Sequence, residues 1–466
     1  MAHRLVLKNF RLVDETMNRF GSVVVEDGRI RDLIPGPAPA LSGGRVIDGG
    51  CLGSAGEPPA LLPALVDLHA HFRDPGLAEK DAALPAETWV LQETWFLQET
   101  LESGSLAAAA GGYGTVVCMA NTKPVIDTPE KAGLLKARSD ALGLIDLYPA
   151  LSLTRAMEGR ELSGVRDLSR LPRSGPGTYV PRLLSEDGRD VAGDGIFLAA
   201  LAEARRLGLP VSCHCDAGGA EAEAAKGAGQ PREVWSRIEE NQGTRRAIAL
   251  GREAGCHIHI AHVSTGEAVA LVRDCKKTVS PGNGPAFSLT CEAAPHHIAL
   301  TGEDARRLGP ESHGRVNPPL RTEADRRALI AGILDGTIDA IATDHAPHTQ
   351  AGKAGGAPGF IGLETAFGVC FTELVREDGI SLSRLSALMS AVPARILGLG
   401  GDRGRIAPGF RGDLFIADTA AARTVGAEPF KSRSRNSPFL GRELRGVVLM
   451  TIHGGRLVFN APVGYT

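Results

Sequence analysis

Eight short apolar runs that alternate with helix-like stretches constrain the fold of this chain more than any other feature of its sequence. The strand-like runs are "ALVDLHAH", "GTVVCMAN", "IDLYPALSL", "TYVPRLLS", "PVSCHCD", "HIHIAHVS", "FSLTCEAAPHH" and "IDAIATDHAP". Helical patterns such as "PEKAGLLKARSDAL" and "EADRRALIAGILDG" separate them. Strands that alternate with helices favour a parallel sheet, and eight of them favour a (β/α)8 barrel. We therefore expect an α/β fold with a TIM-like barrel over residues 61–395.

The two ends of the chain have a different pattern. Short β-type runs with glycine turns fill both ends, as in "GSVVVEDGRIRDLI" and "GVVLMTIHGGRLVF". We expect residues 1–60 and 396–466 to combine into one small β-sandwich domain beside the barrel.

The segment 87–104, "ETWVLQETWFLQETLESG", repeats Glu-Thr every six residues. This period matches neither a helical turn nor a solenoid repeat, and three copies are too few for a repeat domain. We interpret it as a local duplication that lengthens the first strand–helix connection. Its two tryptophans favour a partly apolar lid or contact loop, while a tolerated surface insertion is the simpler interpretation.

Composition narrows the class of protein. The net charge of −3 over 466 residues offers no basic surface for nucleic acid. No apolar run approaches the roughly 18 residues that span a bilayer, and "MAHRLVLKNFRLVDE" lacks the apolar stretch of a signal peptide. Most of the eight cysteines lie inside apolar runs, which is typical of reduced, buried thiols. We expect a cytoplasmic enzyme without a nucleic-acid or membrane partner.

Histidines and acids gather where the expected strands end, which is where barrel enzymes place their chemistry. His69 and His71 lie one residue apart in a strand, so their side chains point to the same face. A lone histidine there is more often an ordinary polar residue, and Asp in "EDG" is usually a turn former. Six such residues at five strand ends favour two divalent metal ions instead. The six are His69, His71, Asp187, His214, His262 and Asp344.

Two ions held about 3.5–4 Å apart lower the pKa of a water between them and polarise a carbonyl oxygen. This chemistry suits the hydrolysis of an amide bond or its reversal. A nearby carboxylate can carry the proton to the leaving nitrogen, and Asp344, at the end of the last strand, is the candidate. We interpret four other polar residues as parts of the fold. Cys213 and Cys215 should face away from His214 and lie in the core, and at least one of His296 and His297 should have a structural role.

Longer strings resemble the class I dihydroorotases of the amidohydrolase superfamily. They are "DLHAHFRDPG", "MANTKPVIDTPE", "APHHIALT", "NPPLR", "ATDHAPHT", "GLET" and "SRSRNSPFLG". They extend from residue 65 to 441 and so cover most of the chain. The resemblance implies a small-molecule substrate and the reversible cyclisation of N-carbamoyl-L-aspartate to L-dihydroorotate in pyrimidine biosynthesis.

The resemblance also implies roles for individual residues. The six candidate ligands would hold two zinc ions: His69, His71 and Asp344 the first, His214 and His262 the second, with Asp187 as the bridge. Asp344 would also shuttle the proton. The implied substrate contacts are Arg73 and Asn121 at the substrate carboxylate, Asn317, His348, and the backbone at Pro358 and Gly359. A guanidinium suits this task because it binds a carboxylate through two parallel hydrogen bonds.

The residue on strand four distinguishes the relatives. Hydantoinases, allantoinases and class II dihydroorotases place a carboxylated lysine there, whereas "TYVPRLLSEDG" has no lysine. Asp187 takes that place, and alternation should direct Glu186 elsewhere. Two alternatives stay open: an allantoinase or hydantoinase type of cyclic amidohydrolase, and a non-catalytic dihydroorotase-like partner of aspartate transcarbamoylase. A homo-oligomer and a complex with aspartate transcarbamoylase are both open for the active enzyme.

Overall fold

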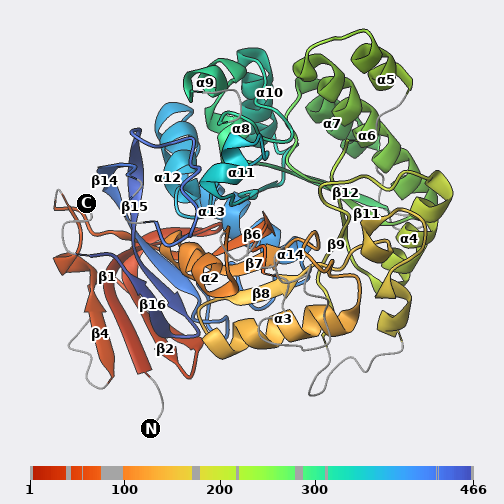
Figure 1. The fold of residues 1–466 in the computed structure, drawn as a ribbon. Coiled ribbons are helices and arrows are strands. Elements are labelled where there is room, and N and C mark those ends of the chain that lie inside the picture. The colour runs from red at the N-terminus through yellow and green to blue at the C-terminus, as the bar shows by residue number, and fades with distance from the viewer. Residues whose placement is uncertain are drawn as a thin grey trace.

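The structure, a computed structural model, describes residues 4–37, 44–54, 56–74, 98–169, 179–216, 220–278, 287–309, 313–426, 428 and 430–462. It has a TIM-barrel-type α/β fold with a β-sheet at one side (Figure 1). Within the described ranges, we find no helix whose length and apolarity would let it cross a membrane.

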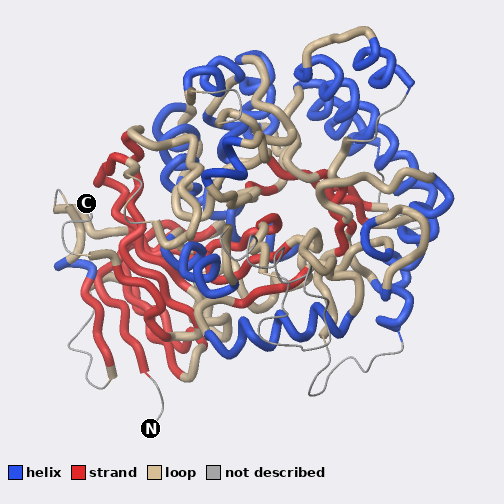
Figure 2. The backbone as a smooth tube through the Cα atoms, in the orientation of Figure 1, coloured by secondary structure: helices blue, strands red, loops and turns tan. Residues whose placement is uncertain are grey.

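Eight short parallel strands form the inner layer of the α/β part (Figure 2). They are β6 (Leu65–Ala70), β7 (Tyr113–Cys118), β8 (Asp146–Pro149), β9 (Leu184–Ser185), β10 (Val211–Cys213), β11 (His257–Ile260), β12 (Ser288–Ala293) and β13 (Ala340–Ile341). They pair in two groups, β6-β7-β8 and β13-β12-β11-β10-β9. Parallel bridges between Leu151 and Leu184 and between Ala70 and His345 link the groups at both edges. Seven of the eight strands lie inside a predicted run, and β7 begins one residue before its run, at Tyr113.

Helices cover the outside of these strands. The longer ones are α2 (Leu101–Ala110), α3 (Pro129–Leu142), α4 (Asp194–Leu207), α6 (Arg232–Ala254), α7 (Gly266–Thr278) and α10 (Glu323–Leu334). Local sequence sets their ends: the Thr128 side chain caps α3, Pro129 occupies its first turn, and Gly143 ends it at φ 62°.

Shorter helical segments fill the connections. They are α5 (Ala220–Gly227), α8 (Pro295–Ala299), α9 (Gly302–Arg307), α11 (Gln350–Ala354), α12 (Ala366–Cys370), α13 (Leu382–Ser386), α14 (Val392–Ile396), the 3₁₀ turns η1 (Gly49–Cys51), η2 (Arg155–Met157) and η3 (Gly164–Ser169), and the π-helical turns η4 (Phe371–Glu377) and η5 (Ala387–Ala391).

Strands from both ends of the chain share the side sheet. They are β1 (Arg4–Asp14), β2 (Met17–Glu26), β3 (Arg29–Pro35), β4 (Arg45–Asp48), β5 (Ala60–Pro63), β14 (Leu414–Thr424), β15 (Glu443–His453) and β16 (Arg456–Asn460). Their order is β16-β15-β14-β5-β1-β2-β3, with β4 also paired to β1. β5 joins the two ends because it pairs with both β1 and β14; the red and dark blue strands therefore lie side by side in Figure 1.

A buried ion-pair network joins this sheet to the parallel strands. Arg403 donates to Asp146, the first residue of β8, at 2.8 Å. Arg411 binds both Asp146, at 3.3 Å, and Asp413, at 2.8 Å. His453 of β15 lies 3.2 Å from the other oxygen of Asp413. Because the two arginines already neutralise these acids, we assign the cluster a structural role rather than a metal.

The interpretation of residues 87–104 as a surface insertion is wrong for its last part. Residues 75–97 lie outside the described residues. Glu99, however, is fully buried, and its carboxylate contacts His345 and the Ser432 hydroxyl. Thr100 caps helix α2 through the amide of Ser103. The repeat therefore ends inside the protein, where Glu99 links the first helix to a segment near the C-terminus.

Candidate metal centre and substrate cavity

Six predicted ligands converge at the carboxyl ends of the parallel strands. His69 lies in β6, His71 and His214 directly follow β6 and β10, and the other three lie a few residues beyond their strands. The whole set is buried: His69, His71, Asp187, His214, His262 and Asp344.

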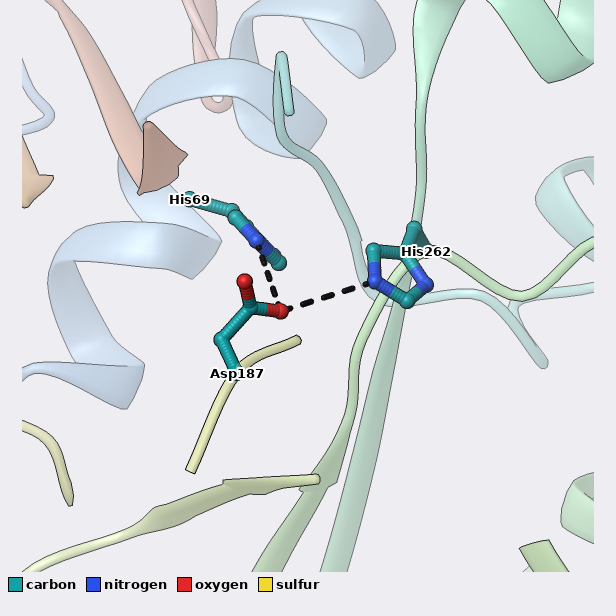
Figure 3. Close-up of side chains that lie close together, drawn as sticks. All are labelled: His69, Asp187 and His262. Atoms are coloured by element: carbon teal, nitrogen blue, oxygen red, sulfur yellow. Dashed lines mark ion pairs between the residues drawn. The ribbon is translucent and has the colours of Figure 1, made fainter. Parts of the chain in front are cut away.

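The Asp187 carboxylate lies at the middle of this set. Its Oδ1 is 3.1 Å from His69 Nε2 and 3.7 Å from His262 Nε2 (Figure 3). The same oxygen is 3.3 Å from His214 Nδ1, while Oδ2 is 3.5 Å from His71 Nε2. One carboxylate therefore faces four imidazole nitrogens.

The other five ligands divide into two groups around Asp187. On one side, Asp344 Oδ1 lies 3.7 Å from His69 Nε2 and 3.3 Å from His71 Nε2. On the other side, His214 Nδ1 lies 2.8 Å from His262 Nε2. Two donor groups that share a carboxylate are the arrangement expected of a binuclear centre.

Unsatisfied polar atoms support a metal at this place. His69 Nε2 and Asp187 Oδ1 are buried and make no hydrogen bond of good geometry, although they lie close together. Such groups are costly in a protein interior unless something else binds them. Imidazole nitrogens and carboxylate oxygens are the ligands that zinc takes, so the residues fit a divalent ion of this type.

Electrostatics favour the charged form of both acids. Burial acts to raise the pKa of Asp187, but the positive charge of His69 and the close imidazole nitrogens of His214 and His262 outweigh it and hold that pKa well below its usual range. For Asp344, burial is likewise outweighed by a hydrogen bond from His71 and by nearby imidazole charge, so its pKa is also low. Both acids are therefore carboxylates at neutral pH and can bind a cation.

Three residues at the site have a strained backbone conformation. Arg73, His262 and Asp344 have φ of 59°, 29° and 47°, in the left-handed region that side chains other than glycine rarely adopt. Each such residue costs on the order of 1–3 kcal/mol and persists where the surrounding structure holds it. The strain therefore accompanies the functional placement of these three side chains.

Neighbouring groups orient the histidines of strand β6. Glu292 Oε1 is 3.1 Å from His69 Nδ1, and Asn121 Oδ1 is 2.9 Å from His71 Nδ1. Each contact fixes the orientation of its imidazole ring, with Nε2 facing the centre. Burial acts to raise the pKa of Glu292, but the charge and hydrogen bond of His259, at 3.0 Å, bring it down to about 2.

Glu292 and His259 are supporting residues that the sequence analysis did not identify. A signal was present, because "HIHI" and "TCEA" place polar side chains at alternate positions of two buried strands. In a barrel these positions point to the interior, which branched apolar residues usually fill.

A cavity of about 220 Å³ opens beside the six residues. Five of the ligands line it, together with every predicted substrate contact: Arg73, Asn121, Asn317, His348, Pro358 and Gly359. Arg73 is buried, and one of its Nη atoms is 3.5 Å from His348 Nε2. Burial lowers its pKa to about 10, so the guanidinium is still charged at neutral pH. The cavity thus combines a fixed positive charge with the candidate metal ligands.

Both asparagines also contact the ligands. Asn121 donates to Asp187 Oδ2 at 3.2 Å, and Asn317 Nδ2 is 3.0 Å from His214 Nε2. They therefore brace the ligands as well as line the cavity, a role that the sequence did not predict.

The structural interpretations of the remaining polar residues are confirmed. Glu186 points away from the centre and accepts hydrogen bonds from the Leu153 and Thr154 amides. Cys213 and Cys215 are buried in the main apolar core. His297 binds the Pro318 carbonyl at 3.0 Å, while His296 Nε2 is 4.0 Å from Asp344.

Comparisons with known proteins agree with this geometry. The Amidohydrolase family model matches residues 60–458. The chain is 36% identical to the dihydroorotase of Clostridium botulinum (strain Eklund 17B / Type B), over 98% of this chain and 99% of that protein. It is 34% identical to the dihydroorotase of Geobacter sp. (strain M21), with the same coverage of both chains.

Solved structures show the same fold at lower identity. The L-hydantoinase (dihydropyrimidinase) of Arthrobacter aurescens superposes with a TM-score of 0.79 at 24% identity, covering 99% of this chain and 96% of that one. The dihydropyrimidinase of Brevibacillus agri NCHU1002 gives 0.78 at 20% identity, covering 98% and 95%. With strand-end ligands, family match and relatives in agreement, the chain belongs to the amidohydrolase family, within its dihydroorotase group.

Proposed function

We propose that the protein is a dihydroorotase that interconverts N-carbamoyl-L-aspartate and L-dihydroorotate in pyrimidine biosynthesis. The observation that carries this proposal is the cavity in which the buried Arg73 guanidinium lies beside six candidate metal ligands. It offers a place for an anionic cyclic amide next to a hydrolytic centre. Relatives named dihydroorotase, 34–36% identical over nearly the whole chain, support the same activity.

We further propose two zinc ions per chain, as in class I dihydroorotases. His69, His71 and Asp344 would hold one, His214 and His262 the other, and Asp187 would bridge them. The division of donor atoms around Asp187 supports this assignment. When bound, such ions acidify the attacking water and polarise the scissile carbonyl.

The chain's own side chains would bind the substrate and move the proton. Arg73 would hold the substrate carboxylate through a bidentate contact, and Asn121, Asn317 and His348 would orient the ring. The backbone at Pro358 and Gly359 would line its other side. The Asp344 carboxylate would take the proton from the attacking water and deliver it to the leaving ring nitrogen, which its ionised state and its position beside the cavity support.

Three broader features complete the proposal: the domains, the location and the assembly. We assign residues 61–395 to the catalytic barrel and residues 1–60 and 396–466 to a small β-sandwich domain, although strand β5 spans the first boundary. A cytoplasmic location is supported by eight cysteines that are all free thiols. We propose that the active form is a homo-oligomer or a complex with aspartate transcarbamoylase.

A spectrophotometric assay that compares L-dihydroorotate, allantoin and hydantoin tests the function directly. We expect turnover of dihydroorotate that exceeds that of both other substrates. Preference for allantoin or hydantoin would reassign the enzyme within its family. Metal-replete protein that is inactive on all three would support a non-catalytic partner of aspartate transcarbamoylase instead.

A further inference from the structure

Lys353 is a buried lysine that holds three backbone carbonyls. It lies in helix α11 with 5% of its surface exposed. Its Nζ donates to Arg315 O at 2.6 Å, Gly359 O at 2.8 Å and Ala357 O at 3.2 Å. An ammonium has three N–H donors, so these carbonyls take up all of its hydrogen-bonding capacity.

The three carbonyls belong to two loops that line the substrate cavity. One loop, residues 313–318, carries Asn317, and the other, residues 355–361, carries Pro358 and Gly359. The Gly359 amide also donates to Arg315 O at 3.0 Å, so the loops meet at the point that Lys353 binds.

The second loop is tightly packed at this point. Gly359 has φ 137°, and a Cβ there would lie 2.5 Å from Ala346 Cβ. Asn436, from the C-terminal segment, donates to the carbonyls of both Ala346 and Gly359, at 3.2 and 3.1 Å. The wall formed by Pro358 and Gly359 is therefore set by hydrogen bonds from two distant parts of the chain, one of which is Lys353.

The surroundings of Lys353 are those of a functional position rather than of an ordinary ion pair. Among the residues that the structure describes, no carboxylate pairs with its ammonium; the charged and titratable groups that face it are Arg315, Arg232 and His348. Its Nζ also lies 4.8 Å from the centre of the Phe360 ring. Burying a cation without an anion is unfavourable, so an apolar side chain would serve better if the position only filled space.

We infer that Lys353 is a positioning residue that cross-links the two loops and thereby fixes the Asn317 and Pro358–Gly359 walls of the substrate cavity. The inference rests on the proposed function, because it concerns how that substrate is held. Lys353 does not touch the reacting atoms and acts through the loop backbone.

The protonation state of Lys353 should control this cross-link. Burial, together with the positive charges of Arg315 and Arg232, lowers the pKa of Lys353 to about 7. The ammonium supplies three donors to three acceptors, whereas the neutral amine supplies two. The cross-link is therefore complete below pH 7 and loses a hydrogen bond as the pH rises through this value.

The test compares Lys353→Met with wild type and with Lys276→Met. Lys276 is a matched control because it also donates to a backbone carbonyl, that of Thr337, but lies away from the cavity. For Lys353→Met we expect the KM for dihydroorotate to rise about tenfold while kcat changes less than threefold. Amide hydrogen exchange should become faster in residues 313–318 and 355–361 and stay unchanged elsewhere. Lys276→Met should change neither quantity.

The outcomes separate this inference from the proposed function. A wild-type enzyme without dihydroorotase activity would overturn the function, whatever Lys353 does. An active wild type whose Lys353→Met variant keeps its KM and its exchange rates in both loops would overturn the cross-link. If the Lys353→Met variant does not fold, Lys353→Gln decides: its amide has two N–H donors in place of three, so the KM and the exchange rates of both loops should rise, and unchanged values would refute the inference.

Discussion

At the scale of single residues, the carboxylate of Asp187 lies at the middle of the site. Asp187 faces four imidazole nitrogens, and neither a lysine nor a second acid of the chain occupies that place among the described residues. Its removal should therefore disturb both donor groups together, while removal of a peripheral ligand should affect one group.

We predict that Asp187→Asn loses metal and activity together. An amide has no charge to offset that of two cations and binds them poorly. Elemental analysis should find close to two zinc ions per chain in metal-replete wild type and fewer than one in the variant. Asp190→Asn, a change in the same loop at an acid paired with Arg246, should keep its metal. Fewer than one zinc per wild-type chain would contradict a binuclear centre.

Arg73 should contribute through the substrate carboxylate. A charge-assisted bidentate contact in a partly desolvated cavity contributes roughly 1.5–3 kcal/mol, so Arg73→Met should lower kcat/KM on dihydroorotate by one to two factors of ten. Arg73→Lys keeps the charge but loses the planar pair of donors, so its kcat/KM should lie between those of wild type and Arg73→Met. Steady-state kinetics measure this. Arg155→Met, at an exposed ion pair, is the control and should have no effect. An unchanged kcat/KM in Arg73→Met would show that this guanidinium does not bind substrate.

The sequence predicted the six candidate ligands because each lies at or just beyond the end of a strand, and the carboxyl ends of barrel strands meet. It did not predict Glu292, Lys353 or Asn436. Lys353 and Asn436 bind backbone carbonyls, and such contacts carry no side-chain pattern. Asn436 reaches Gly359 across 77 positions of the chain. Partners of this kind depend on how loops pack, which periodicity does not describe.

At the scale of elements, a carboxylate holds the start of helix α12 to the C-terminal segment. Glu364 accepts hydrogen bonds from the Lys431 amide at 2.9 Å and from the Ser432 amide at 3.0 Å. Burial raises its pKa from an ordinary value of 4.5 to about 7. The folded chain therefore binds this proton more tightly than the unfolded chain does.

This shift should make the stability of the protein depend on pH. Where the folded pKa of an acid is raised, its contribution is most favourable below the unfolded pKa and is lost as the pH rises toward the folded value. Between pH 4.5 and 7, the free energy of unfolding should fall by on the order of 3 kcal/mol through Glu364 alone. Urea unfolding at several pH values measures it. In Glu364→Gln, the free energy of unfolding should depend less steeply on pH. Equal pH dependence in the variant and in wild type would contradict the raised pKa of Glu364.

The sequence located the parallel strands but not their lengths. β9 and β13 are two residues long, although the runs that contain them extend over eight and ten. In the β13 run, apolar character continues past the ladder because the loop that carries Asp344 is buried; in the β9 run it precedes the ladder, where Tyr179 and Leu183 are buried. Hydrophobicity records burial, and here burial extends past the hydrogen bonding that defines a strand.

At the scale of the whole molecule, the side sheet and the parallel strands are joined by buried charges. Arg403 and Asp413 are each 6% exposed, and with Arg411 and Asp146 they form a connected network. A buried charge that loses its partner is strongly destabilising, typically by about 3–5 kcal/mol.

Arg403→Met should therefore lower the free energy of unfolding by about 3 kcal/mol while leaving the metal content of the folded enzyme unchanged. Chemical denaturation and elemental analysis measure the two quantities. Arg395→Met breaks an exposed pair with Glu15 and should change stability by less than about 1 kcal/mol. If both variants were equally stable, the network would not be what holds the sheet to the barrel.

The contacts of Asn436 and Ser432 also determine when the site can form. Ser432 binds Glu99, and Asn436 binds the carbonyls of Ala346 and Gly359 at the cavity wall. These two residues follow every strand and helix of the barrel in the chain, so they leave the ribosome after the barrel has emerged. During synthesis, a nascent barrel would therefore have all six candidate metal ligands before its candidate substrate wall is complete, and we expect it to recognise its substrate only when this late segment docks.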